Sequence, residues 1–137
     1  MAVQAFKDAF VEVDGTDLSA FIRQVTIEYS AEPLDKTGVG DSTRQRFGGL
    51  KDVNISMDFY QDFDSGSVDA IMFPLVGSST VSVIVRPSTA VASSTNPQYT
   101  VTAFMENFTP VAGNVGEVMM SPVRFSAGAG DLSRVTT

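Results

Sequence analysis

The sequence predicts a mainly β protein, an antiparallel β-sandwich or partly closed barrel with one short flanking helix. Several short segments alternate apolar and polar residues, and turn-forming residues separate them. Only one stretch carries the signals of a helix start followed closely by a helix stop. With 137 residues, 43% of them hydrophobic, the chain is long enough for a single domain with a buried core.

The first half of the chain supplies three predicted strands. Residues 10–13 form a short extended run that ends at the tight-turn sequence Asp14-Gly15. Residues 25–30 and residues 53–60 alternate with period two, which is typical of antiparallel strands with one buried face. The side chains expected to face the core in the second of these strands are Val53, Ile55, Met57 and Phe59.

A long loop is expected at about residues 31–49, between these two alternating segments. It contains Pro33, four glycines and charges of both signs, without a sustained period. Such a loop is uncommon inside a compact domain unless it is functional or ordered by a partner. Its small basic patch is suited to an acidic neighbouring subunit. The candidate inter-subunit residues of this loop are Asp35, Lys36, Asp41, Arg44 and Arg46.

The second half supplies the helix and three more strands. A short helix is predicted at about residues 67–75, with Ser67 as its N-cap and Pro74 near its end. Strands are expected at residues 81–86, 99–111 and 117–126. The small and polar residues at about 127–137 predict a flexible C-terminal tail, ordered only where a neighbour holds it.

Composition excludes several kinds of chemistry. The chain has neither Cys nor His, which rules out thiol nucleophiles, disulfides, Ser-His catalysis and the usual zinc ligands. Sixteen acids against nine bases give a net charge of −7, which disfavours tight binding to nucleic acid or to an anionic membrane. Neither a signal-peptide pattern nor an apolar run of membrane-spanning length is found.

Carboxylates are the remaining candidates for chemistry. Glu28, Asp58 and Glu106 fall on the polar faces of predicted strands, but nothing in the sequence supplies a cleft for acid–base catalysis. Asp62 and Asp64 resemble part of a calcium loop, yet the EF-hand spacing of glycine and the final glutamate is missing. We therefore predict no enzyme activity, no metal and no cofactor.

An ordered set of landmarks along nearly the whole chain resembles the major tail tube protein of long-tailed (siphovirus-like) bacteriophages or of a related phage-like particle. Each landmark alone is a common turn or strand, so the resemblance depends on their order. The landmarks are residues 13–19, 25–29, 41–46, 49–52, 61–63, 66–69, 73–77, 83–87, 96–100 and 113–116.

This resemblance implies a structural virion protein of one domain over residues 1–137. Hexameric rings of it would stack into a hollow tail tube through which DNA passes during ejection. The implied partners are other copies of the chain, the tail tip or initiator, the tape measure and terminator proteins, and DNA that passes without tight binding; no membrane is involved. The implied location is the virion, after synthesis in the cytoplasm of the host bacterium.

On this resemblance Glu28, Asp58 and Glu106 become candidate lumen-facing acids, because carboxylates repel the phosphate backbone of passing DNA. An acidic outer surface that keeps the protein soluble is the alternative interpretation of the same residues. Two other functions stay open, namely another phage structural β-domain (head decoration or tail completion) and a monomeric ligand-binding β-sandwich.

Overall fold

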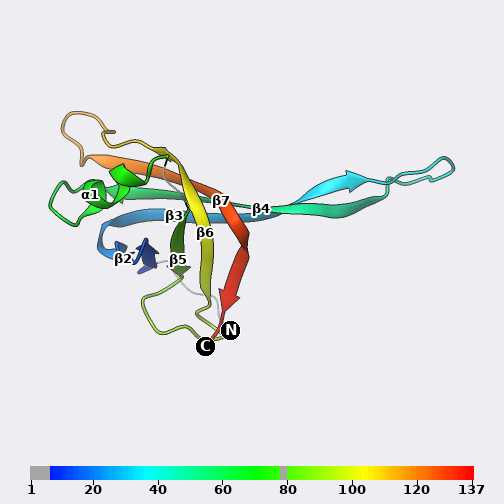
Figure 1. The fold of residues 1–137 in the computed structure, drawn as a ribbon, viewed down its shortest axis with the longest axis horizontal. Helices are drawn as coiled ribbons and strands as arrows, with labels where there is room; N and C mark the ends of the chain where they lie inside the picture. The colour runs from blue at the N-terminus through cyan, green and yellow to red at the C-terminus, as the bar shows by residue number, and fades with distance from the viewer. Residues whose placement is uncertain (1–6, 78–79) are drawn as a thin grey trace.

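The structure, a computed structural model, describes residues 7–77 and 80–137, and these residues form seven strands, one short α-helix and two 3-10 turns (Figure 1). The elements are β1 (Phe10–Val13), β2 (Thr16–Asp17), η1 (Ser19–Phe21), β3 (Ile22–Asp35), β4 (Arg46–Tyr60), α1 (Val68–Met72), η2 (Phe73–Leu75), β5 (Val81–Arg86), β6 (Gln98–Phe108) and β7 (Met120–Val135).

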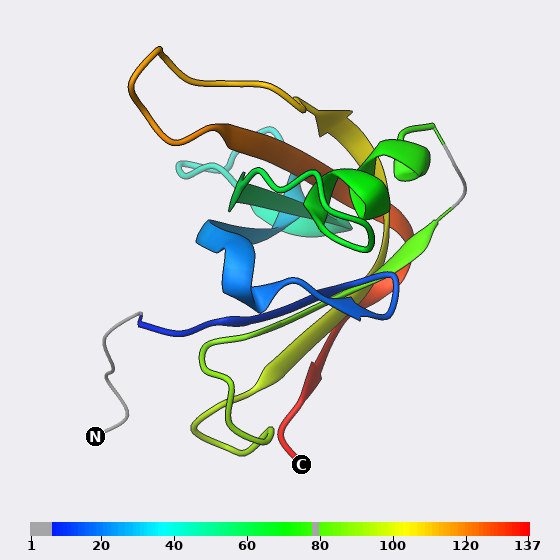
Figure 2. The same cartoon turned by 90° about the vertical axis from the view of Figure 1, so that its left-hand side faces the viewer.

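All seven strands belong to one antiparallel sheet in the order β2-β1-β5-β6-β7-β4-β3. The sheet curls around the core without closing into a complete barrel, and α1 lies inside the curve (Figure 2). The prediction of a mainly β, partly closed structure with one short helix is thus confirmed.

The core lies on the concave face of the sheet. The four residues of β4 predicted to face inward are all buried, and Val123 and Phe125 of the adjacent strand β7 are buried beside them. Val68 and Met72 of α1 are fully buried against the same cluster. Burial of each large side chain contributes about 1.5–3 kcal/mol, so the period-two pattern accounts directly for the packing.

The predicted helix at 67–75 is present as α1 followed by the 3-10 turn η2, which contains Pro74. Ser67 does occupy the N-cap position, but its hydroxyl donates to Asp62 Oδ2 at 2.8 Å rather than accepting from the helix. Asp62 also accepts a bond from the Asp64 amide at 3.0 Å. The Asp64 amide, and then the Ser67 hydroxyl, lower the pKa of the Asp62 carboxyl. The predicted N-cap position of Ser67 is thus confirmed, although its side chain makes no capping hydrogen bond to the helix.

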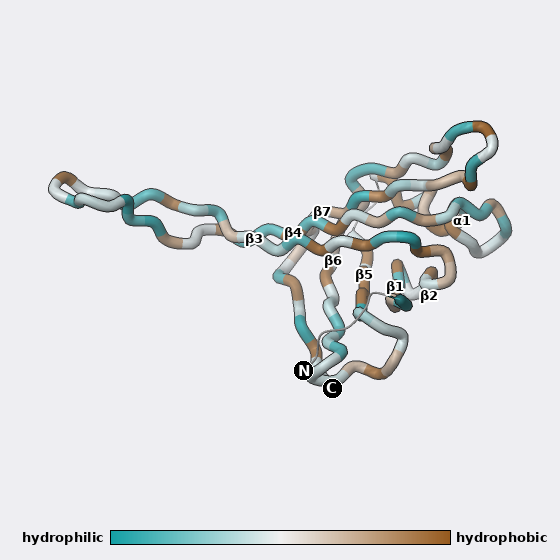
Figure 3. Tube along the Cα trace, turned by 180° about the vertical axis from the view of Figure 1, so that it is seen from behind, coloured by the Kyte–Doolittle hydropathy of each residue, from teal (hydrophilic) through white to brown (hydrophobic). Residues whose placement is uncertain are grey.

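About half of the long loop predicted at 31–49 is strand. β3 and β4 stay paired from Ile22–Phe59 out to Asp35–Arg46, so only residues 36–45 form the connecting loop. Hydrogen bonds between β3 and β4 pair the backbone N–H and C=O groups of this segment. It therefore stays extended although its sequence has no regular apolar period. Leu34 packs over Gly49, where an added Cβ would lie 2.9 Å from Leu34 Cδ1. The resulting hairpin, residues 31–51, projects from the body and is called the arm below (Figures 1 and 3).

The predicted flexible tail was also wrong over most of its length. β7 continues to Val135 and pairs with β6 as far as Gln98. Its small residues allow close passage, because a Cβ on Gly128 would clash with Thr80 Cγ2 and would lie 3.2 Å from the Ala103 carbonyl carbon. The small residues of this part of β7 are therefore explained by the close approach of its neighbours rather than by a turn. The neighbour that holds the segment in place is β6.

Candidate functional site

Four adjacent strands, β6-β7-β4-β3, present a polar surface on the face opposite the core. Glu28 pairs across β3 and β4 with Asn54, and Asp58 pairs with Gln24. Since side chains alternate along a strand, both acids point away from the core-facing residues. Glu106 contacts Ser126, which is paired with Asn54. The fold therefore brings Glu28, Asp58 and Glu106 together on one sheet face.

This surface is called the polar face. Glu28 and Glu106 are exposed on it, and Asp58 is half-buried. Most of its other members are hydroxyl or amide side chains. Its polar residues include Gln24, Thr26, Glu28, Asp52, Asn54, Ser56, Asp58, Glu106, Asn107, Arg124 and Ser126, and the 40% exposed Phe104, paired with Ser126, lies on the same face.

Two charged residues of the polar face were missed by sequence reasoning. Asp52 pairs with Ser30, one step along the same face from Asn54, so alternation could have identified it. Arg124 lies 3.3 Å from Glu106 Oε2, with both side chains about half exposed. Four acids and one base give the polar face a net negative charge. An exposed ion pair of this kind contributes little stability, so it mainly reduces the charge at Glu106.

A hollow on the polar face has one carboxylate in its lining. This shallow hollow beside Asp58 is lined by Ser56, Asn107, Thr109 and Arg124, with Asp58 as its single acid. General acid–base chemistry on two carboxylates needs a second one at a fixed separation. Across residues 7–77 and 80–137, no group of three His, Cys, Asp or Glu side chains could hold a metal ion. In the same residues no helix is long and apolar enough to cross a membrane.

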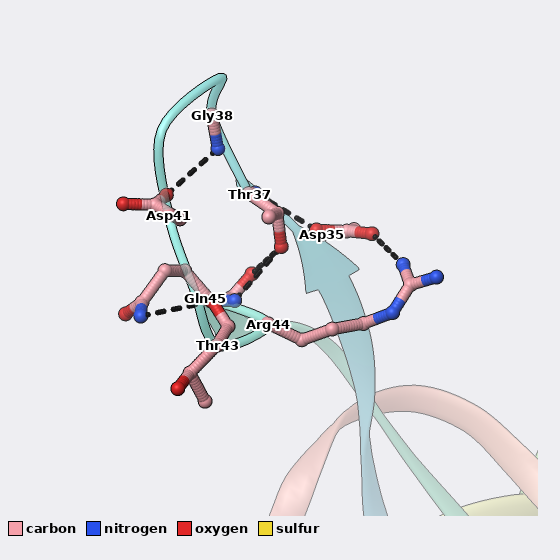
Figure 4. Close-up of polar contacts among 7 residues, drawn as sticks. All are labelled: Asp35, Thr37, Gly38, Asp41, Thr43, Arg44 and Gln45. Atoms are coloured by element: carbon pink, nitrogen blue, oxygen red, sulfur yellow. Dashed lines mark hydrogen bonds and ion pairs between the residues drawn. The ribbon is translucent and has the colours of Figure 1, made fainter.

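The tip of the arm is ordered by its own hydrogen bonds (Figure 4). Asp35 accepts from the Thr37 amide at 2.8 Å and forms an ion pair with Arg44 at 2.9 Å. Asp41 accepts from the Gly38 amide at 2.8 Å. Hydrogen bonds from the side chain and amide of Thr37, and then Arg44, hold the pKa of Asp35 below its usual value. The tip is thus a folded turn rather than a structureless loop.

The five predicted arm residues all lie at this tip and are exposed. Asp35, Arg44 and Asp41 hold the turn together. Lys36 lies over the Phe47 ring, with Nζ 5.8 Å from the ring centroid. The Arg46 side chain has no hydrogen bond or ion pair to any residue that the structure describes. Of the three bases among these five residues, Arg46 is therefore the one most available to a partner.

Sequence reasoning missed the apolar residues of the arm. Val39 at the tip is fully exposed, Leu50 is 81% exposed and Phe47 is 49% exposed. Their signal was hidden because the segment has no regular period and is rich in glycine. Figure 3 shows hydrophobic positions on an otherwise hydrophilic arm. Exposed apolar groups on a projecting element are typical of a contact surface.

No protein-family model matches the sequence, and no curated protein sequence matches it either. Solved structures do share the fold. A chain from the tail of an empty gene transfer agent particle, described with C6 symmetry, superposes with a TM-score of 0.74 at 18% identity, covering 96% of this chain and 98% of that one.

Two further structures extend this likeness. A chain of the SPP1 tail tube gives a TM-score of 0.73 at 9% identity, covering 95% of this chain and 77% of that one. A chain of the sheath–tube complex of an extracellular contractile injection system gives 0.69 at 12% identity, covering 98% and 92%. The resemblance inferred from the sequence is confirmed at the level of the fold, which is that of tail tube subunits.

Proposed function

We propose that the chain is the structural subunit of a phage or phage-like tail tube. Copies form six-membered rings that stack into a hollow tube, and DNA passes through the tube during ejection. The role is geometric and requires no catalysis. The fold is shared, over 96% of this chain, with a chain from the tail of a gene transfer agent particle, and this likeness supports the structural role.

The polar face is the single observation that carries the proposal. It is one open sheet surface with four acids and one base, and the hydrophobic core lies behind it. In a closed ring, this face lines the bore and Glu28, Asp58 and Glu106 are its lumenal acids. Carboxylates repel DNA phosphates, while the hydroxyl and amide side chains remain hydrated, so DNA slides without adhering.

The sheet edges favour closure into a ring. β3 is an end strand of the sheet, and its outer edge lacks a neighbouring strand within the described chain. A long unpaired edge exposes backbone N–H and C=O groups that can pair with a strand of another chain. Pairing between copies protects this edge and extends the four-strand surface around the bore.

The arm is the proposed contact between stacked rings. It is exposed along its length and already folded at its tip. A preformed arm loses less conformational entropy on docking than a disordered loop does, so more of the contact energy stabilises the assembly.

In the particle, the further partners are the tail tip or initiator, the tape measure and the terminator proteins. The subunit is made in the host cytoplasm and resides in the virion tail. These assignments follow from the tube role and are tested with it.

Negative-stain electron microscopy of the purified chain across a concentration series tests the proposal. Hollow tubes or stacked six-fold rings are the expected result. Isolated rings or trimers that never stack would instead favour a head decoration or tail-completion protein. A monomer at every concentration, with or without a tail-tip nucleus, would contradict the tube role and favour a ligand-binding β-sandwich.

A further inference from the structure

The molecule has two chemically different ends. β3 and β4 leave the body at one end as the arm. At the other end, β4 runs into residues 61–77, and residues 109–119 connect β6 to β7. Gln61 joins these two segments, since its amide donates to the Met119 carbonyl at 3.0 Å and its side chain to the Pro110 carbonyl at 2.6 Å. We call the two segments together the loop end; Figure 1 shows it opposite the arm.

The arm concentrates the positive charge of the chain. Residues 31–51 hold four of the nine bases but only three of the sixteen acids. Asp35 neutralises Arg44 through their ion pair, which leaves Arg46 as an exposed base without a partner in the described structure. Val39 places a fully exposed apolar side chain at the tip. The arm therefore offers a cation and an apolar group together.

The loop end is acidic and apolar. It contains four acids and no base, and Asp64 and Glu117 are its exposed acids. Residues 111–117 and Met119 surround an open hollow of about 300 Å³. Large apolar side chains are exposed on both segments of the loop end: Phe63 (59%), Phe73 (67%), Val76 (51%), Val111 (65%), Val115 (107%), Val118 (65%) and Met119 (39%).

Within residues 7–77 and 80–137, the loop end is the acidic surface that best combines exposed acids with large exposed apolar side chains. The acids near the N-terminal strands, such as Asp8, Asp14 and Asp17, have no large exposed apolar side chain in residues 7–17 beside them. The polar face is acidic as well, but Arg124 already occupies part of it. Complementary charge and desolvated apolar groups together give both specificity and affinity.

We propose that the arm of one copy docks on the loop end of the next copy, with Val39 entering the hollow of residues 111–119 and Arg46 facing Asp64 and Glu117. The proposal rests on the tube function and names its stacking surface. Because the two surfaces are different and lie at opposite ends of one molecule, the contact is head-to-tail. A head-to-tail contact between unlike surfaces repeats without limit unless a rotation closes it, as stacking into a tube requires.

Cysteine cross-linking tests this contact cleanly, because the natural chain has no cysteine. Val39→Cys protein is mixed with Val115→Cys protein under assembling conditions and then oxidised. A disulfide-linked dimer containing both variants is the expected product. The matched control replaces the second variant with Val91→Cys, another exposed valine (83%) that lies outside the loop end.

A charge exchange provides the second measurement. Arg46→Glu is expected to lower the yield of tubes about tenfold, and Asp64→Arg with Glu117→Arg in the same chain is expected to restore it. Arg134→Glu, at an exposed base outside the arm, serves as the matched control and is expected to leave the yield unchanged.

The outcomes separate the two proposals. Wild-type protein that never forms rings or tubes would contradict the tube function itself. Wild-type tubes in which Val39→Cys links to Val91→Cys as well as to Val115→Cys, or in which Arg46→Glu has no effect, would overturn the docking surface and leave the tube function standing.

Discussion

At the scale of single residues, the buried positions of the core follow most directly from the sequence. Phe59 and Phe125 are fully buried on adjacent strands β4 and β7. Phe59→Ala is expected to lower the free energy of unfolding by about 3–5 kcal/mol, because it removes a large side chain and leaves a cavity. Urea denaturation measures the change. Phe73→Ala, at a position 67% exposed, is the control and is expected to cost less than about 1 kcal/mol; equal losses would contradict this packing.

A single carboxylate, Asp62, fastens the loop that precedes α1. Its pKa is lowered by the Asp64 amide and then by the Ser67 hydroxyl. A depressed folded-state pKa gives stability that is present above the unfolded pKa and is lost as pH falls through the folded value. Asp62→Asn is therefore expected to be less stable than the wild type at neutral pH, with the difference shrinking below about pH 4. Thermal unfolding from pH 7 to pH 2.5 measures this, and a constant difference across that range would refute it.

The acids of the polar face are expected to act on DNA through their shared negative charge rather than through any one contact. In the double variant Glu28→Lys with Asp58→Lys, the face changes from four acids and one base to two acids and three bases. Both residues lie on the face opposite the core, where substitutions change stability little, so tubes are expected to form. DNA is expected to be held by the bore, and particles carrying the variant should eject it poorly. Infectivity of complemented particles measures the effect, with Asp131→Lys as control; normal infectivity of the double variant would count against a lumenal polar face.

At the scale of elements, the arm is separable from the body. Pairing from Ile22–Phe59 to Ala31–Lys51 belongs to the sheet, and the arm beyond it contributes no buried side chain. Replacement of residues 32–50, which lie between the paired Ala31 and Lys51, by Asn-Gly, a favoured two-residue turn, is expected to leave a cooperatively folding monomer that forms no tubes. Sedimentation and electron microscopy measure this outcome. Tubes from the shortened chain would remove the arm from any role in stacking.

The elements also show where sequence reasoning stops. Period-two alternation located the strands that border the core, because a buried face constrains every second residue. The outer arm and the end of β7 have two exposed or crowded faces, so alternation was absent there. Pro33, Gly49 and Gly128 carry turn-like signals, yet all three lie within strands. Strand pairing across the sheet held these segments extended against their local composition.

The candidate site, like the strands, was predictable from the sequence only in part. Glu28, Asp58 and Glu106 were found because each occupies a polar position in an alternating strand. The pairing of Glu106 with Arg124 was not predictable, because it depends on the register of β6 against β7 and on the irregularity between Met105 and Asn107. Long-range register is a property of the folded sheet, and one sequence does not specify it locally.

At the scale of the whole molecule, the proposed tube makes a prediction about the size of its bore. If six copies each contribute the four strands of the polar face, about 24 strands at roughly 4.8 Å spacing and a tilt near 45° give a backbone radius of about 26 Å. Side chains reduce this to a channel about 40 Å wide, which admits a hydrated duplex roughly 20 Å across with water on all sides. We therefore expect cross-sections of the assembled tube to show six-fold symmetry and a channel near this width. Electron cryomicroscopy of the tubes measures both quantities. A channel narrower than the duplex, or one lined by the α1 side of the sheet, would exclude DNA passage along the polar face, since that face would then lie outside the bore.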